Sequence, residues 1–240
     1  MTTLLLPKSV TVFIPARGGS KGIPAKNLQI VRDVPLVQQA VEVALGLRHS
    51  ISNVTIVVST EDEEIRKVAE SAGAKIHDRL PEHSGDSSPT EAALSDYLER
   101  HSDIPTDEVI VLMQCTSPST TVDNLMDGIK QVCGPFDSSF IGVENHHWLY
   151  REVDGYFQPV GHHLGHRPSR QKVEPTVHET GAAYFFSKSG FERNQFRLHG
   201  KIGCVKVDML GYIDIDEPSD LDLARKVLGR KNRTNHANSL

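Results

Sequence analysis

Short β-branched segments alternate along the chain with longer segments whose apolar residues have helical spacing. Residues 9–16 (SVTVFIPA) form a continuous apolar run, which is typical of a strand buried on both faces of a parallel sheet. Residues 35–47 follow with apolar side chains at helical spacing, and Pro35 suits the first turn of a helix. Residues 53–60 predict a second strand, which ends in Ser-Thr, a pair suited to cap the next helix.

The same alternation continues to residue 144. Further helices are expected at residues 61–73, 88–101 and 122–133, and further strands at residues 74–78, 108–117 and 138–144. Strands that alternate with helices in this way predict an α/β fold with a doubly wound, mostly parallel sheet and right-handed crossovers. In such sheets ligands bind beyond the carboxyl ends of the strands. The loops after the first and fourth strands are therefore expected to converge.

The alternation breaks at residues 145–180. Aromatic residues there flank Asp154-Gly155, a pair typical of a hairpin turn. We interpret the segment as an excursion from the sheet, either a lid or an arm that packs on a partner.

The pattern of strand and helix returns after this excursion. Residues 181–191 predict a return to strand and helix, and residues 201–208 predict a last strand. Residues 212–228 predict an acidic loop followed by a final helix. The whole reads as one domain over residues 8–230, followed by a polar tail, residues 231–240, that is expected to be disordered.

The composition excludes several classes of protein. The 240 residues carry a net charge of −5, which argues against non-specific nucleic-acid binding because that requires a basic face. Three widely spaced cysteines fit neither a disulfide framework nor a structural zinc site. No apolar run approaches the length of a membrane span. We expect a cytoplasmic protein that binds no membrane.

The loop after the first strand combines cations with glycines. Arg17, Lys21 and Lys26 surround Gly18 and Gly19, although the spacing matches neither a Walker loop nor a dinucleotide fingerprint. A solvated basic loop would explain the cations alone. Adjacent glycines, however, let backbone N–H groups approach an anion, and Arg and Lys add charge that suits phosphate. The loop is therefore predicted to bind phosphate.

Two aspartates near the end of the chain are candidates for a metal site. Asp214 and Asp216 are two residues apart, so in an extended strand both face one side while Ile213 and Ile215 face the core. Mg²⁺ commonly binds one or two carboxylates together with substrate phosphates. The alternative is an acidic strand end that faces solvent. Because the same chain has a predicted phosphate-binding loop, we favour the interpretation of these two aspartates as a metal site.

Other polar motifs are weaker. QCTSPS offers an amide and hydroxyls at a strand end, but ordinary turn chemistry accounts for it equally well. The histidines His162, His163 and His166 lack a carboxylate or cysteine that would complete a zinc set, so a polar loop is the better interpretation. Cys115 has no histidine near it in sequence and is not expected to be a nucleophile.

Taken together, these motifs resemble one family. IPARGGSKGIPAKNL is similar to the signature of the acylneuraminate cytidylyltransferases (CMP-sialic acid synthetases), and the resemblance covers residues 10–228 in the family's order through VVSTEDEEI, QCTSPS, SRQ, TGAAYFF and IDIDEPSDLDLA. It implies a nucleotidyltransferase, Rossmann-like fold with a hairpin arm for dimerisation. It also implies a reaction in which CTP and a nine-carbon acidic α-keto sugar give a CMP-sugar and pyrophosphate with Mg²⁺.

The resemblance also implies roles for individual residues. Those carried over as catalytic are Arg17, Lys21, Lys26, Asp214 and Asp216, of which the two aspartates would also bind the metal. Those carried over to the nucleotide are Ala16, Gly18, Gly19, Ser20, Asn27, Arg79 and Thr90. Those carried over to the sugar are Gln114, Thr116, Ser117, Arg170, Gln171 and Tyr184.

The chain departs from the family pattern at Cys115, Ser119-Thr120 and Thr180, where the family commonly has Pro, Leu-Arg and Asn. These positions lie near the expected sugar site, so the acidic sugar stays open among N-acetylneuraminate, legionaminate, pseudaminate, deaminated analogues and 3-deoxy-manno-octulosonate. A phosphatase for such sugars would need a D-x-D-x-[TV] motif, which DIDEP does not complete. A non-catalytic nucleotide-binding protein is the other alternative.

Overall fold

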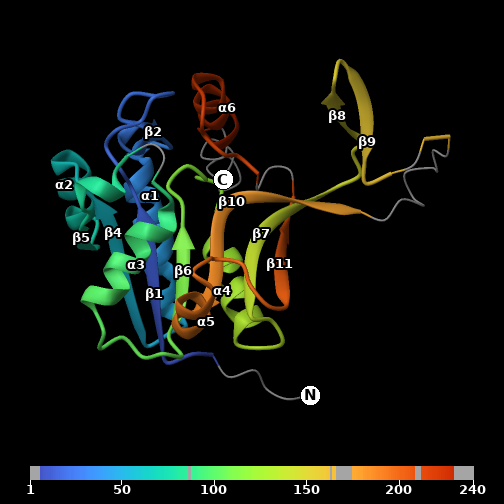
Figure 1. The fold of residues 1–240 in the computed structure, drawn as a ribbon. Coiled ribbons are helices and arrows are strands. Elements are labelled where there is room, and N and C mark those ends of the chain that lie inside the picture. Colours follow the sequence, from blue (N-terminus) through green and yellow to red (C-terminus); the bar gives the residue numbers. More distant parts are fainter. Residues whose placement is uncertain (1–5, 86–87, 163, 166–174, 209–211, 230–240) are drawn as a thin grey trace, which may run out of the picture.

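The structure is a computed structural model that describes residues 6–85, 88–162, 164–165, 175–208 and 212–229. Its main sheet contains β1 (Ser9–Pro15), β4 (Asn53–Thr60), β5 (Lys75–Asp78), β6 (Val109–Met113), β7 (Ser138–Asn145), β10 (Thr176–Ser187) and β11 (Ile202–Val207). The seven strands have the order β11-β7-β10-β6-β1-β4-β5 (Figure 1). The predicted doubly wound, mostly parallel sheet is confirmed. One strand departs from it, since β10 runs antiparallel to both β6 and β7.

The helices occur where the apolar spacing predicted them. They are α1 (Leu36–Leu45), α2 (Glu63–Ser71), α3 (Thr90–Arg100), α4 (Val122–Val132), α5 (Lys188–Asn194) and α6 (Pro218–Leu228), with short 3₁₀ turns η1 (Lys26–Leu28), η2 (Gly46–His49) and η3 (Pro81–His83). The cap predicted for α2 was wrong. Asp62, rather than Ser59-Thr60, caps this helix, and its Oδ1 accepts hydrogen bonds from the N–H groups of Glu64 and Ile65, both at 2.9 Å.

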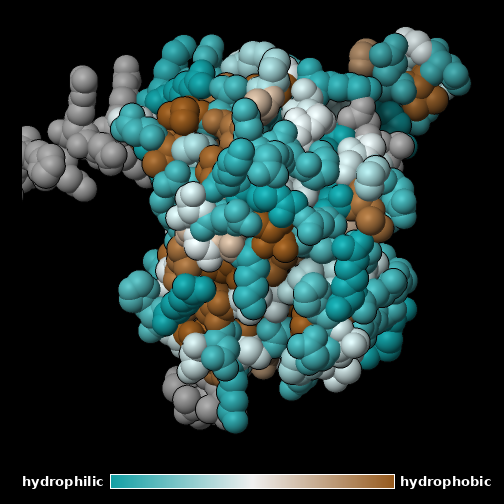
Figure 2. All heavy atoms as spheres, turned by 90° about the vertical axis from the view of Figure 1, so that its left-hand side faces the viewer, coloured by the Kyte–Doolittle hydropathy of each residue, from teal (hydrophilic) through white to brown (hydrophobic). Residues whose placement is uncertain are grey.

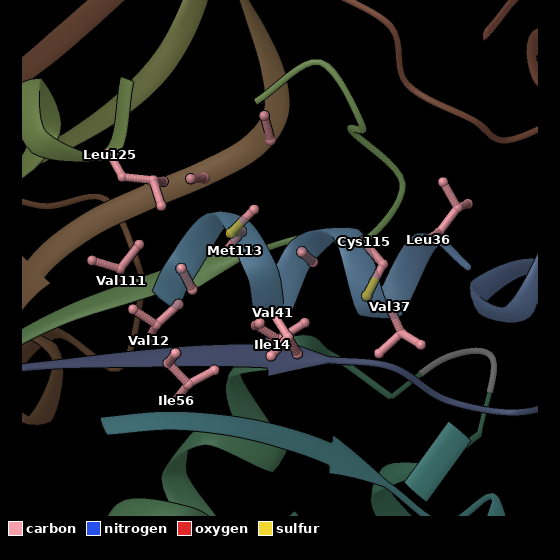
Figure 3. Close-up of a cluster of buried hydrophobic side chains, with 14 of the residues drawn as sticks. Val12, Ile14, Leu36, Val37, Val41, Ile56, Val111, Met113, Cys115 and Leu125 are labelled. Carbon is pink, nitrogen blue, oxygen red and sulfur yellow. The ribbon is translucent and has the colours of Figure 1, made fainter. Parts of the chain in front are cut away.

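Two hydrophobic layers sandwich the sheet. The alternation of side chains along β1 sends Val12 and Ile14 to the layer under α1, α2, α4 and α6, and Phe13 to the layer under α3 and α5. Figure 3 shows Val41 of α1 next to Ile14, and Val37 farther along the same helix, near Cys115. The central strands are thus buried on both faces, as their continuous apolar runs predicted, and the polar loops are left at the strand ends.

An arm projects from this core. The far ends of β7 and β10 pair with each other, and between them lies a two-stranded hairpin of β8 (Leu149–Val153) and β9 (Tyr156–Val160) (Figure 1). The turn is at Asp154-Gly155, as predicted, with φ values of 52° and 81°. The hairpin exposes several large apolar side chains: Leu149, Tyr150, Tyr156 and Phe157.

A second small ribbon, β2 (Ile30–Val31) with β3 (Val34–Pro35), lies between the first loop and α1. On the side of the molecule that carries α2 and β5, hydrophilic residues cover most of the surface (Figure 2). Among the described residues, no helix is both long enough and apolar enough to cross a membrane. The tail predicted for residues 231–240 lies outside the described residues.

Candidate active site

A polar cavity of about 380 Å³ lies at the carboxyl edge of the sheet. β1 and β6 end at this edge (Figure 1), and the cavity is where parallel α/β sheets bind ligands. Most of the residues predicted for the nucleotide, sugar and metal line it, namely Arg17, Ser20, Lys26, Asn27, Arg79, Thr90, Gln114, Thr116, Tyr184, Asp214 and Asp216. The predicted convergence of the first and fourth strand-end loops is confirmed.

Some predicted residues lie elsewhere. Ala16, Gly18, Gly19 and Lys21 belong to the same loop as Arg17, but they are not among the residues that line the cavity. Ser117 lines a neighbouring cavity beside α1 and has no hydrogen-bond partner for its buried Oγ. The remaining two predictions, Arg170 and Gln171, lie outside the described residues.

The first loop brings its cations to the cavity through local backbone contacts. Asn27 is buried, and its side-chain amide donates to the carbonyl oxygen of Arg17 at 3.0 Å, which fixes the loop onto η1. Lys26 extends its Nζ to within 2.9 Å of Asp216 Oδ1. The cation predicted for phosphate therefore meets the carboxylate predicted for metal.

The glycines of this loop have functions that the sequence pattern did not predict. A Cβ at Gly18 would lie 2.5 Å from Asp62 Oδ2, so this glycine lets the start of α2 approach the loop. A Cβ at Gly22 would lie 2.6 Å from the carbonyl oxygen of Asp216. The N–H of Gly18 donates to Glu61 Oε1 at 2.9 Å, so a carboxylate already occupies one donor of the expected anion nest. Gly19 alone has open space at its Cβ.

The acidic segment, residues 212–216, is a loop, as predicted. Residues 212–216 pair with no neighbouring strand, and a single backbone bond, from Ile215 N to Thr116 O at 3.0 Å, holds the segment to the loop after β6. The predicted alternation nevertheless holds. Ile213 and Ile215 are buried, while Asp214 and Asp216 line the cavity.

Burial and the charge of Asp216 raise the pKa of Asp214, although a hydrogen bond from Thr116 and the charge of Lys26 oppose this. Each of the two carboxylates disfavours the ionised form of the other, so a cation bound between them would stabilise both. Within the described residues, no group of three or more His, Cys, Asp or Glu side chains is placed to hold a metal. A metal held by Asp214 and Asp216 would need further oxygen ligands from a substrate or water, which is the manner in which Mg²⁺ is commonly bound.

Arg197 is a cavity residue that sequence reasoning missed. Its Nε and Nη2 donate to the two carboxylate oxygens of Glu91 at 2.6 and 2.8 Å, and its guanidinium carbon lies 4.7 Å from the centre of the Tyr184 ring. The Tyr184 hydroxyl in turn donates to Glu179. Arg197 lies in no recognisable motif, and its partner is 106 residues away, so the sequence carried no local signal for it.

Cys115 is buried next to the cavity, and burial raises the pKa of its thiol to about 12. Only the thiolate is a good nucleophile. The expectation that Cys115 is not a nucleophile therefore agrees with its environment. Of the arm histidines, His162 packs against Trp148 and Tyr150, while His163 and His166 lie outside the described residues.

Comparisons with known proteins agree with this geometry. A family model described as cytidylyltransferase matches residues 11–134. The chain is 32% identical over 226 residues to N-acylneuraminate cytidylyltransferase A of Danio rerio, an alignment that covers 91% of this chain and 50% of the relative. It is 28% identical over 214 residues to N-acylneuraminate cytidylyltransferase of Streptococcus agalactiae serotype V, covering 87% of this chain and 50% of the relative. The chain thus spans about half the length of the curated relatives it matches.

Among solved structures, the fold is similar to that of CMP:2-keto-3-deoxy-manno-octonic acid synthetase complexed with CTP. The TM-score is 0.68 with 16% identity, and the superposition covers 94% of this chain and all of the other.

Proposed function

The chain belongs to the cytidylyltransferase family, and we propose that it transfers CMP from CTP to a nine-carbon or similar acidic α-keto sugar, such as N-acetylneuraminate. The observation that carries the proposal is the cavity itself, in which Arg17 and Lys26 of the first loop lie opposite Asp214 and Asp216. Cations that suit a triphosphate and carboxylates that suit a divalent cation share one space. This is the combination that phosphoryl transfer requires.

In the proposed reaction the anomeric hydroxyl oxygen of the sugar forms a bond to the α-phosphorus of CTP. The bond between the α-phosphorus and the bridging oxygen breaks, pyrophosphate leaves, and the hydroxyl proton is lost to solvent. Such transfers depend mainly on positioning and on neutralising charge. Arg17, Lys21 and Lys26 would hold the phosphates that leave, and donors fixed before the reaction lower its barrier most effectively.

Mg²⁺ is the proposed cofactor, and its ligands would be Asp214 and Asp216. When bound, it would neutralise phosphate charge and polarise the reacting oxygens. The raised pKa of Asp214 supports this assignment, because two neighbouring carboxylates gain from a shared cation. Lys26 would keep Asp216 neutralised before substrates arrive, since its Nζ is 2.9 Å from that carboxylate.

The sugar end of the site is proposed from Gln114, Thr116 and Tyr184, all of which line the cavity. Gln114 follows β6 and offers an amide. Tyr184 lies under the Arg197 guanidinium, which holds its ring in place. Arg170 remains the proposed partner of the sugar carboxylate, and Gln171 remains a proposed sugar-binding residue. The acidic sugar could be any of those the sequence left open.

We also propose that the protein is a homodimer joined through the arm. The β8–β9 hairpin exposes Tyr150, Tyr156 and Phe157 with more than half of each side chain in solvent, at 52, 55 and 67%. Large apolar groups gathered on a projecting element are typical of an interaction surface. The three cysteines are free, which supports a reducing compartment such as the cytoplasm.

The direct test is pyrophosphate release from CTP and Mg²⁺ in the presence of a panel of acidic α-keto sugars. Release with one or more of these sugars, and not with neutral sugars, is expected. If CTP binds but no member of the panel gives pyrophosphate, a nucleotide-binding protein without this activity is the better conclusion.

A further inference from the structure

Arg79 lines the candidate active site and carries a buried donor without a partner. Its side chain is 8% exposed and lines the cavity, yet its buried Nη2 has no hydrogen-bond partner. A buried donor without an acceptor costs free energy, so an explanation is needed for why this N–H group is left unpaired. A ligand oxygen in the cavity would supply the missing acceptor.

A buried chain of hydrogen bonds stands behind this guanidinium. Arg79 Nε donates to Ser59 Oγ at 3.1 Å, and Ser59 Oγ lies 3.0 Å from His77 Nδ1. His77 Nε2 lies 2.9 Å from Asp96 Oδ2. Ser59 is fully buried and His77 is 3% exposed, so no solvent competes for these bonds.

The hydrogen bonds of this chain have a consistent direction. An arginine can only donate, so Ser59 Oγ accepts from Arg79 and keeps one hydrogen to donate. His77 Nδ1 lies within reach of that hydrogen and accepts it when the ring is neutral. Burial lowers the pKa of His77 and so favours the neutral ring, with its hydrogen on Nε2 and directed at Asp96.

We propose that His77 is a positioning residue for nucleotide binding, which through Ser59 holds Arg79 with its Nη2 aimed at an oxygen of the bound CTP. The inference rests on the proposed function, and it extends that function to a residue that lines no part of the cavity. The oxygen acceptor belongs either to the cytidine end or to the phosphates, and the experiment below separates the two.

The arrangement makes CTP binding depend on pH. The charged and titratable groups that face His77 are Asp96, Arg100 and Tyr97 from α3, and Asp78 and Arg79 at the end of β5. Burial lowers the pKa of His77, and the charges of Arg100 and Arg79 lower it further against the opposing effect of Asp96. Protonation would place an N–H on the side of Ser59 and a second positive charge beside Arg79. CTP affinity should therefore be constant near neutral pH and fall in acid, below the ordinary histidine value of 6.5.

Two substitutions separate positioning from packing. In His77→Gln the acceptor beside Ser59 is lost while a side chain of similar length remains, so CTP should bind about tenfold more weakly at pH 7.5, as expected for one bond to a charged group. In His77→Asn the amide oxygen stands near the place of Nδ1 and does not titrate. This variant should bind within about threefold of wild type, and it should lose the part of the acid-dependent fall that His77 contributes, since an amide does not titrate.

The measurement is calorimetric titration with CTP between pH 5.5 and 8. The phosphates of CTP titrate identically with every variant, so the difference between variants isolates His77. Tyr97→Phe is the matched control, because the Tyr97 ring lies 5.5 Å from the His77 ring but takes no part in the hydrogen bonds that run from Arg79 to Asp96. It should keep both the affinity and the pH profile of wild type.

Inorganic tripolyphosphate identifies the acceptor. An equal loss for tripolyphosphate and CTP in His77→Gln assigns Arg79 to the phosphates, and a loss for CTP alone assigns it to the cytidine end. Either result supports the positioning role. If wild type binds CTP and His77→Gln binds it equally well with the same pH profile, the inference is overturned while the proposed function stands.

Wild-type protein that binds no CTP would instead overturn the proposed function. If His77→Gln does not fold, as judged by its thermal melting, Ser59→Ala removes the same link from the other side. The same loss of affinity is expected, and an unchanged affinity would again overturn the inference.

Discussion

Lys26 Nζ and Asp216 Oδ1 lie 2.9 Å apart, which joins the first loop of the chain to the acidic segment near its end. The Lys26 side chain is 15% exposed and that of Asp216 is 75% exposed, so the lysine is the fixed partner and the carboxylate is the accessible one. A cation entering the site can reach Asp216 from solvent while Lys26 remains available to a phosphate. The predictions below follow from this and related contacts.

Replacing Asp216 should abolish catalysis without unfolding the protein. Asp216→Asn removes a carboxylate proposed for Mg²⁺ and leaves Lys26 without its partner, so turnover should fall by at least about 100-fold, as for other losses of charge stabilisation. The assay is pyrophosphate release at saturating CTP and Mg²⁺. Asp222→Asn on the exposed side of α6 is the control, and it should be fully active. A rate near wild type for Asp216→Asn would remove the metal assignment.

The two glycines at positions 19 and 22 should respond differently to alanine. At Gly22 the added Cβ would lie 2.6 Å from the Asp216 carbonyl oxygen, so the loop or the acidic segment must shift and turnover should drop sharply. At Gly19 nothing lies within 4 Å, so the free energy of unfolding should stay within about 0.5 kcal/mol of wild type. Thermal melting and pyrophosphate release measure both effects. Equal activity of the two variants would contradict the close approach at Gly22.

The Glu91–Arg197 pair should stabilise the fold in a pH-dependent way. Burial acts to raise the pKa of Glu91, but the hydrogen bonds and charge of Arg197 together bring it below the ordinary value of 4.5. A depressed carboxyl pKa contributes stability above about pH 4.5, and this stability is lost as pH falls through the lower folded value. Glu91→Gln should cost about 3 kcal/mol at pH 7, because it leaves a buried guanidinium without its counter-charge.

Urea unfolding at pH 7, 5 and 3.5 tests this. The difference between wild type and Glu91→Gln should shrink toward pH 3.5, because the contribution of the pair is lost progressively once the pH falls below the ordinary carboxyl value of 4.5. Glu64→Gln, an exposed position on α2, should show no difference at any pH. A constant gap across the three pH values would mean that charge is not the source of the effect.

Cys115 should be inert in the folded protein. Its thiol is buried with a pKa of about 12, so a thiol reagent at pH 8 should modify it only after denaturation, whereas Cys133 and Cys204 are partly exposed and should react earlier. Peptide mapping of the labelled sites distinguishes the three. Cys115→Ala should retain activity, and a loss greater than its effect on stability would restore the thiol as a candidate for chemistry.

Local pattern was sufficient to predict most of the sheet and its helices, because burial on both faces imposes a continuous apolar run and helices impose their spacing. It did not predict that β10 runs antiparallel, since strand direction depends on the path of the arm. The sequence predicted an acidic loop at residues 212–216 whose side chains alternate as in a strand, and the structure shows that alternation without any pairing to a neighbouring strand. Alternation of apolar and polar residues indicates which side chains are buried, but it does not indicate whether a neighbouring strand is present.

The candidate site was predictable where its residues follow strands and form a motif, as in Arg17, Lys26 and Asp216. It was not predictable where a side chain depends on a distant partner. Arg197 reaches the cavity because Glu91 holds it, and a single sequence carries no signal for such a pair.

The contact between Gly22 and Asp216 also bears on how the protein is made. Residues 17–27 leave the ribosome before the segment that completes their cavity, which follows about 190 residues later. This loop therefore lacks its contacts with Asp216 until almost the whole domain has been synthesised. Chains cut short before residue 214 could keep the central strands, yet they would lack the carboxylates proposed for the metal. The complete site can therefore form only after synthesis of the domain is almost finished.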